Sequence, residues 1–215
     1  MVIAKEHVLL RGEDLILTNQ RVVFWPKKQA LILSDLHIGK TAHFRKNGIP
    51  IPAELLYKDL ERLKHLIHHF NPNTLFIVGD LFHAEFNGDV KVFQKWMQQF
   101  TISMVLIKGN HDKNSFILYE SLDIEIIQNY LELTPFIFSH DITVLKEDEF
   151  YISGHIHPGV LIKGKGRQRI KLPCYQITNQ QLVLPAFSLF TGLNTRNNLD
   201  NCKNFVFTDN SIFKM

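Results

Sequence analysis

Several features that define large protein classes are scarce in this sequence. Its 215 residues include only two cysteines, which are too few for a disulfide framework and favour a reducing compartment, the cytoplasm. No stretch approaches the roughly 20 consecutive apolar residues that a membrane helix needs. The formal net charge is only +3, well below that of a dedicated nucleic-acid coat protein. These absences predict a soluble cytoplasmic protein without a membrane-spanning helix.

The composition that remains is that of an ordinary globular domain. Hydrophobic residues make up 45% and charged residues 21%, and a chain of 215 residues can bury a full apolar core. No internal repeat, low-complexity tract or linker divides it, so we expect a single domain over residues 1–215. The unusual number is that of the histidines, eleven. Because histidine is the commonest metal ligand in proteins, their positions are informative.

The apolar pattern predicts alternating strands and helices in the first half of the chain. Short apolar runs at 31–33, 75–78 and 104–107 are typical of buried strands. Apolar residues recur at helical spacing over 53–70, and a second helix is expected over 89–99. This alternation implies parallel strands with right-handed crossovers. The beginning and the second half of the chain instead have the pattern of short strands with close turns, so we expect an α/β sandwich with a more antiparallel second half.

Polar clusters directly follow five of the predicted strands. Their side chains with metal-binding potential are those of Asp35, His37, Asp80, Asn110, His111, His140, His155 and His157. Ligands of open α/β sheets bind beyond the carboxyl ends of the strands, so these clusters should converge. Alternate residues of an extended segment point to the same side, which gives Asp35 and His37 a shared direction, and His155 and His157 likewise.

The combination of donors in these clusters indicates a particular chemistry. Two aspartates, one asparagine oxygen and several imidazoles suit Mn²⁺, Fe or Zn²⁺, and the absence of clustered cysteines argues against a structural zinc site. Two divalent ions held by two aspartates leave a positively charged site, which attracts and polarises a phosphate group and activates water. Gly79, Gly109 and Gly154 lie in these clusters, where the backbone has to pass close to an ion or ligand.

In type and order, these motifs resemble those of the calcineurin-like metallophosphoesterase superfamily. The motifs are Asp35-x-His37, Gly79-Asp80, Gly109-Asn110-His111-Asp112, His140 and Gly154-His155-x-His157. The resemblance implies a four-layer α/β/β/α sandwich with mixed sheets. It also implies two divalent metal ions, with manganese favoured and iron or zinc as alternatives.

The resemblance also implies a role for each motif residue. One metal ion would be held by Asp35, His37, Asp80 and His157. The other would be held by Asp80, as a bridge, with Asn110, His140 and His155. His111 would contact the phosphate and protonate the leaving oxygen.

A narrower resemblance rests on His83 and on segments outside the metal motifs. At the position of His83, this sequence resembles the DNA-repair nucleases of the superfamily, which also have a histidine there, whereas the protein phosphatases have an aspartate. By that resemblance, His83 would orient His111. The segments are 38–50, 172–175, 184–187 and 190–192. Together they resemble the bacterial PdeM family of ligase-associated DNA-damage-response endonucleases. That family implies a repair locus shared with a DNA ligase, a helicase and a second nuclease.

Basic residues near the motifs have two interpretations. Lys40, His43 and Arg45 closely follow the first motif and would bind substrate phosphate, although a solvated surface turn also explains them. Arg167 and Arg169 belong to an alternating basic stretch in a predicted hairpin, where one side could follow a nucleic-acid backbone. Basic residues on an exposed edge strand also prevent aggregation, so both interpretations stay open.

The sequence therefore predicts a dinuclear metallophosphoesterase that hydrolyses phosphodiesters, with nucleic acid as the leading substrate class. One alternative is hydrolysis of a small nucleotide or a pyrophosphate-linked metabolite by the same residues. Another is a non-catalytic scaffold of this fold, against which the intact ligand set argues. We expect Phe187 and Phe190 in the core rather than as platforms for stacked bases. Nothing in the sequence determines the oligomeric state.

Overall fold

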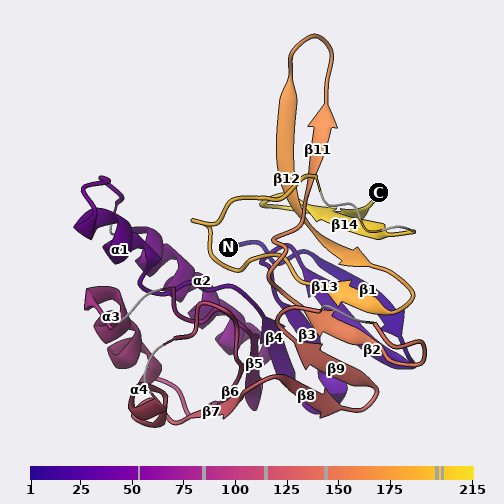
Figure 1. Cartoon of the computed structure of the whole chain (residues 1–215). Coiled ribbons are helices and arrows are strands. Elements are labelled where there is room, and N and C mark those ends of the chain that lie inside the picture. Colours follow the sequence, from indigo (N-terminus) through magenta and orange to yellow (C-terminus); the bar gives the residue numbers. More distant parts are fainter. Residues whose placement is uncertain (53, 84–85, 114–115, 143–144, 197–198, 200) are drawn as a thin grey trace.

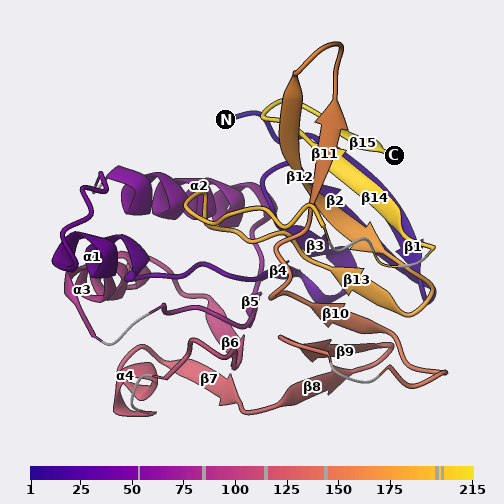
Figure 2. The same ribbon diagram turned by 45° about the horizontal axis from the view of Figure 1, so that its top comes forward.

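The computed structural model describes residues 1–215 except 53, 84–85, 114–115, 143–144, 197–198 and 200, and it describes only the backbone of residues 116 and 117. Its strands form two sheets that pack face to face (Figures 1 and 2). In the described chain, the first sheet has the strand order β1 (Lys5–Leu10), β2 (Glu13–Thr18), β3 (Val23–Trp25), β4 (Ala30–Leu33), β5 (Thr74–Val78), β6 (Ser103–Ile107) and β7 (Ile124–Ile127).

The second sheet is built from the second half of the chain. Its strand order is β15 (Ile212–Lys214), β14 (Lys203–Phe207), β12 (Arg169–Ile177), β13 (Gln181–Val183), β10 (Tyr151–Ser153), β9 (Phe136–Ser139) and β8 (Tyr130–Leu133). A further strand, β11 (Gly159–Lys163), pairs with the first part of β12. Both sheets are mixed, because β4 to β7 are parallel within an otherwise antiparallel first sheet, and β10 is parallel to both of its neighbours.

The helices cover one face of the first sheet (Figure 1). They are α1 (Lys40–Lys46), α2 (Glu54–Phe70), α3 (Gly88–Met97) and α4 (Phe116–Glu120). None of the helices in the described residues is long and apolar enough to span a membrane. The predicted helix over 53–70 is α2, apart from residue 53, which lies outside the described residues, and the predicted helix over 89–99 is α3.

The parallel strands β4, β5 and β6 are buried on both faces, which explains their unbroken apolar runs. In β4, Leu31 and Leu33 pack against the helices, whereas Ala30 and Ile32 pack against the second sheet. The strands β5 and β6 alternate in the same way. The core between the sheets contains many aromatic rings, among them Trp25, whose ring centroid lies 5.0 Å from that of Phe136. One core thus joins the two sheets and fixes how their strand ends meet.

The predicted sandwich with mixed sheets is confirmed, with one difference in its layers. The four described α-helices and the short 3-10 helix η1 (Pro26–Lys28) all precede β7, and no described helix covers the outer face of the second sheet. The physical reason lies in the chain after β7, where short strands follow one another and several of the connecting segments are only a few residues long. The α/β/β part of the predicted α/β/β/α arrangement is therefore present in the described residues, and the last helical layer is not.

Candidate metal centre

The five polar motifs lie at the carboxyl ends of strands from both sheets. The strands are β4, β5 and β6 of the first sheet and β9 and β10 of the second. The residues that follow them are, in order, Asp35 and His37, Asp80, Asn110 and His111, His140, and His155 and His157. The predicted convergence at one edge therefore involves the ends of two sheets rather than one.

Six of these side chains form two compact groups of potential metal ligands. The groups are Asp35, His37 and His157, and Asp80, His140 and His155. Within each group, one ligand atom from every residue lies within 4.8 Å of the others, close enough for one ion to contact all three. Each group combines residues from both sheets, so the packing of the sheets on each other creates both groups.

Direct contacts within the groups show how closely the donors approach. Asp35 Oδ1 lies 3.0 Å from His157 Nε2, and Asp80 Oδ2 lies 3.3 Å from His140 Nε2. Asn110 joins the second group, since its Oδ1 lies 3.2 Å from His140 Nε2 and 3.1 Å from the ring of His155. The ring Nδ1–H of His140 donates to the carbonyl oxygen of Val78 over 2.9 Å, which leaves Nε2 directed at the group.

The protonation of His37 and Asp80 suits metal binding. Both ring nitrogens of His37 are buried and have no hydrogen-bond partner in the described part of the chain. Burial also lowers the pKa of His37 to about 3, so its ring is neutral and offers a lone pair. Burial acts to raise the pKa of Asp80, but the hydrogen bond and the charge of His140, together with the backbone N–H of His111, outweigh burial and lower the pKa to about 2. An unpartnered buried imidazole is costly, and a metal ion would remove that cost.

The backbone around the groups is held in a conformation that side-chain-bearing residues rarely adopt. Five residues of the groups have a positive φ, between 50° and 66°, and they are Asp35, His37, Asp80, His155 and His157. Such backbone costs on the order of 1–3 kcal/mol per residue and persists where the surrounding structure enforces it. Its concentration in the ligand groups marks this edge as a functional site rather than an accidental cluster.

Two of the three glycines in the motifs leave room for the side chains of the ligand groups. A Cβ atom on Gly79 would lie 2.1 Å from Nδ1 of His140, and one on Gly109 would lie 2.2 Å from Oδ1 of Asp80. The Gly79 backbone also has a φ of +82°. Any side chain at these positions would therefore displace a ligand of the second group.

Asp112 has a structural role that its motif did not reveal. Its carboxylate accepts hydrogen bonds from the backbone N–H groups of Asp80 at 2.8 Å, Phe82 at 2.9 Å and Gly109 at 2.9 Å. Burial raises the pKa of Asp112 to about 6, in spite of these hydrogen bonds. The residue thus ties the loop after β5 to the loop after β6. Its place in the motif was visible in the sequence, but the backbone groups it binds were not.

The two histidines predicted to take part in catalysis lie beside the ligand groups. The backbone N–H of His111 donates to Oδ1 of Asp80 over 2.9 Å. The rings of His83 and His111 are stacked, with centroids 4.7 Å apart and planes at 22°, and the ring of His37 lies 5.5 Å from that of His111. Burial, followed by the charge of His111, lowers the pKa of His83 to about 4, so its ring is neutral. His83 therefore contacts His111 through stacking.

The predicted substrate-binding residues of α1 differ in their surroundings. Lys40 is half-buried, and burial lowers its pKa while Asp35 and Asp80 act to raise it, which places its charge near both aspartates. The exposed His43 has its ring centroid 5.9 Å from that of His83. Arg45 instead forms an ion pair with Asp89 of α3 at 3.0 Å. Lys40 and His43 thus border the site, whereas Arg45 holds two helices together.

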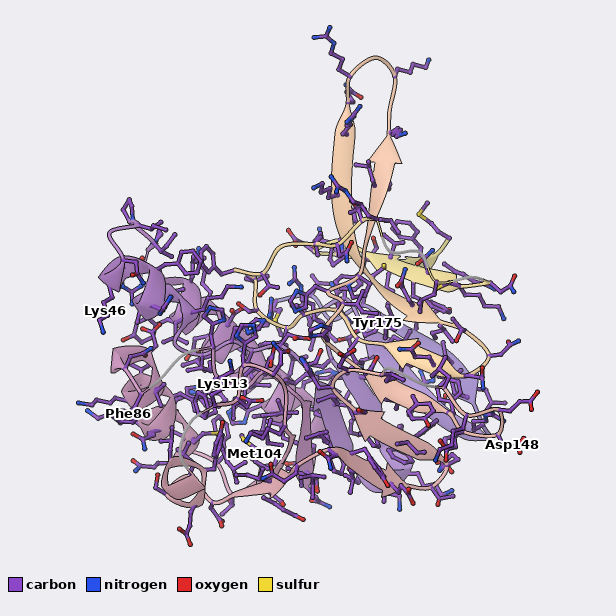
Figure 3. The ribbon with its side chains drawn as sticks, viewed as in Figure 1. Lys46, Phe86, Met104, Lys113, Asp148 and Tyr175 are labelled. Atoms are coloured by element: carbon purple, nitrogen blue, oxygen red, sulfur yellow. The ribbon has the colours of Figure 1, made fainter. Side chains whose placement is uncertain are left out.

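Arg167 and Arg169 lie far out on a hairpin that projects beyond both sheets (Figures 1 and 2). The pairing of β11 with β12 sets Lys163 opposite Arg169 and Leu161 opposite Lys171, so the basic side chains of Lys163, Arg169 and Lys171 share one face, whereas Arg167 lies in the turn between the strands. The opposite face carries apolar residues, namely Val160, Ile162, Ile170 and Leu172. Side chains at the tip of the hairpin extend away from the rest of the molecule (Figure 3). The hairpin starts two residues after His157, so the beginning of its first strand lies at the site, whereas its turn lies away from the site.

Comparisons with known proteins found two similar solved structures and one family model. The chain is similar to the Pseudomonas putida nuclease MPE, with a TM-score of 0.80 and 29% identity over 94% of this chain and 96% of that one. It also matches YfcE, a phosphoesterase from E. coli, with a TM-score of 0.44 and 15% identity over 84% of this chain and 88% of that one. No curated protein matches. The family model for calcineurin-like phosphoesterases matches residues 29–180.

That match covers all five motifs, from Asp35 to His157, which the structure brings together at one edge. The likeness to a nuclease also agrees with the resemblance to the PdeM family. The chain therefore belongs to the calcineurin-like phosphoesterase family and is a metal-dependent phosphoesterase.

Proposed function

We propose that this chain is a phosphodiesterase that works with two divalent metal ions and cleaves nucleic acid. The observation that carries the proposal is the pair of ligand groups, each with one buried aspartate and two histidines, next to the stacked rings of His83 and His111. The likeness to a protein named as a nuclease supports the choice of substrate. The family resemblance of His83 supports a phosphodiester over a phosphomonoester.

The donors present fit two divalent ions. The first ion would be held by Asp35, His37, Asp80 and His157. The second would be held by Asp80, Asn110, His140 and His155. Oxygen and imidazole donors without thiolates favour manganese, with iron or zinc as alternatives. When bound, the two ions would polarise the phosphate ester and activate the attacking water.

The remaining chemistry belongs to side chains of the protein itself. His111 would bind the phosphate and donate a proton to the leaving oxygen. Its backbone is fixed by the hydrogen bond to Asp80, and its ring is fixed by stacking on His83, which acts as a positioning residue. Lys40 and His43 would attract the substrate phosphate at the edge of the site.

The wider setting follows the resemblance to the PdeM family. It supports a cytoplasmic role in bacterial DNA repair, in association with a DNA ligase, a helicase and a second nuclease. Hydrolysis of a small nucleotide or a pyrophosphate-linked metabolite would use the same ligands and the same acid. A panel of DNA, RNA, cyclic-nucleotide and phosphomonoester substrates with Mn²⁺ separates these activities.

Metal content tests the dinuclear site. We expect two divalent ions per chain after metal-replete purification, and loss of activity with a chelator. Gly79→Ala should lower the metal content, because its Cβ would meet the ring of His140. Gly12→Ala is the matched control, because Gly12 has nearly the same φ, +81°, but no atom within 4 Å of the added Cβ. Elemental analysis that finds no stoichiometric transition metal in the folded wild-type protein would contradict the proposal.

Leaving-group dependence tests the role of His111. His111→Ala should keep its metal content while kcat falls ~10²–10⁴-fold on poor leaving groups. The loss should be smaller on nitrophenyl esters, because nitrophenolate needs little protonation. His83→Ala should give a weaker form of the same pattern. Equal losses of kcat on both kinds of ester would show that His111 positions the phosphate and does not act as an acid.

The salt dependence of binding tests the hairpin. Each phosphate contact releases condensed counterions, so Arg167→Ala with Arg169→Ala should flatten the logarithmic salt dependence of oligonucleotide binding by ~2. Hydrolysis of a small nitrophenyl diester should change little, because the ester cannot reach the hairpin from the metal ligands. A matched double variant removes the same charge from Lys27 and Lys28, which precede β4 at the end opposite Asp35. If the hairpin variant binds as the wild type does at every salt concentration, the hairpin is only a solvated projection.

A further inference from the structure

A row of aromatic rings leads from the ligand groups to the surface between α1 and the loop after β13. It starts with His111, which stacks on His83 at 4.7 Å. The ring centroid of Phe44 lies 6.5 Å from that of His83, and the ring of Phe190 follows at 5.6 Å and at 87° to Phe44. Lys40 Nζ lies 5.8 Å from the centroid of the Phe190 ring. The row thus ends in two phenylalanines and a cation.

Phe190 is only partly buried, unlike Phe187. Phe187 is fully buried, with the Arg62 guanidinium 4.1 Å from its ring centroid, so it belongs to the core as the sequence predicts. Phe44 and Phe190 are half-buried. A small pocket between α1, α2 and the loop is lined by His37, Lys40 and Phe190, among others. Phe190 and His37, a residue of the first ligand group, therefore border the same depression.

The loop that carries Phe190 is fixed relative to the ligand groups. The backbone N–H of Ser188 donates to the carbonyl oxygen of Asp35 over 3.1 Å. On its other side, the N–H of Leu189 donates to the buried carboxylate of Asp59 in α2 over 3.2 Å. Arg62 forms an ion pair with Asp59 at 3.1 Å and donates to the carbonyl oxygen of Phe187. A surface anchored at both sides holds its rings at a set distance from the site.

We propose that Phe44 and Phe190 form a platform for a nucleobase whose own phosphate lies at the ligand groups. This inference rests on the proposed function, because it requires a substrate that contains a nucleotide. Every base has a flat face, so aromatic rings bind nucleotides without reading their sequence. Lys40, beside both the platform and the two aspartates, supplies a positive charge for the phosphate that joins base and site.

Competitive inhibition tests the platform. The reporter is Mn²⁺-supported hydrolysis of methyl 4-nitrophenyl phosphate, and the inhibitors are thymidine 5′-monophosphate and deoxyribose 5-phosphate, which differ by the base. We expect the nucleotide to inhibit the wild-type protein more strongly than the sugar phosphate. Phe190→Leu and Phe44→Leu should each reduce that ratio of inhibition constants, with ~5–150-fold as the range when base stacking is lost. Phe190→Tyr keeps a ring and should keep the ratio.

The matched control is Phe213→Leu, which removes a ring that is 39% exposed in β15, outside the ligand groups. It should leave the ratio unchanged. Equal inhibition by the two compounds in the wild type, or an unchanged ratio in Phe190→Leu, would overturn the platform while the phosphodiesterase stands. A wild-type protein that binds Mn²⁺ but hydrolyses neither this reporter nor any oligonucleotide would overturn the proposed function and the platform with it. Because the readout is a ratio, a general loss of activity in a variant does not imitate the expected result.

Discussion

The concentration of buried, potentially metal-binding side chains at the shared edge of the two sheets is the constraint on which the rest of the structure depends. Asp35 and Asp80 are almost fully buried, and they lie among imidazoles, of which the ring of His37 has no hydrogen-bond partner in the described residues. Removing such groups from water costs several kcal/mol unless they are paired or bind metal. The positive φ values, the glycines without room for a side chain and the buried Asp112 all serve this arrangement. The fold holds an arrangement that two divalent ions would stabilise.

Buried hydrogen bonds and an ion pair connect the ligand groups to the loops and the helix around them. Asp112 fixes the loops after β5 and β6 by accepting their backbone N–H groups. Asp59 and Arg62, both buried in α2, hold the loop that also binds the backbone of Asp35. These contacts link the rigid core to the residues that would meet the substrate. The outer part of the hairpin projects away from this network (Figure 1), and its two strands pair with each other from Gly159 opposite Pro173 out to Lys163 opposite Arg169. The proposed platform for a base is therefore anchored to the core, whereas the hairpin proposed to bind the nucleic-acid backbone projects from it.

The sequence predicted the site best where the functional residues lie close together along the chain. Motifs such as Asp35-x-His37 follow apolar strands directly, so both the strands and the edge at which they converge could be predicted. Long-range partners could not be predicted, because Arg45 of α1 pairs with Asp89 of α3 and nothing in the sequence around Arg45 indicates that ion pair. The same limit applied to Phe190, whose exposure depends on the anchoring of its loop by α2. The predicted outer helical layer followed from family resemblance alone, and the described residues of the second half lack it.

The central claim is that the two groups of donors hold two metal ions at the same time. Anomalous scattering from crystals grown with Mn²⁺ tests it most directly. We predict two peaks per chain, one among Asp35, His37 and His157 and the other among Asp80, Asn110, His140 and His155, with Asp80 in contact with both. A single peak, or peaks away from these residues, would contradict the account.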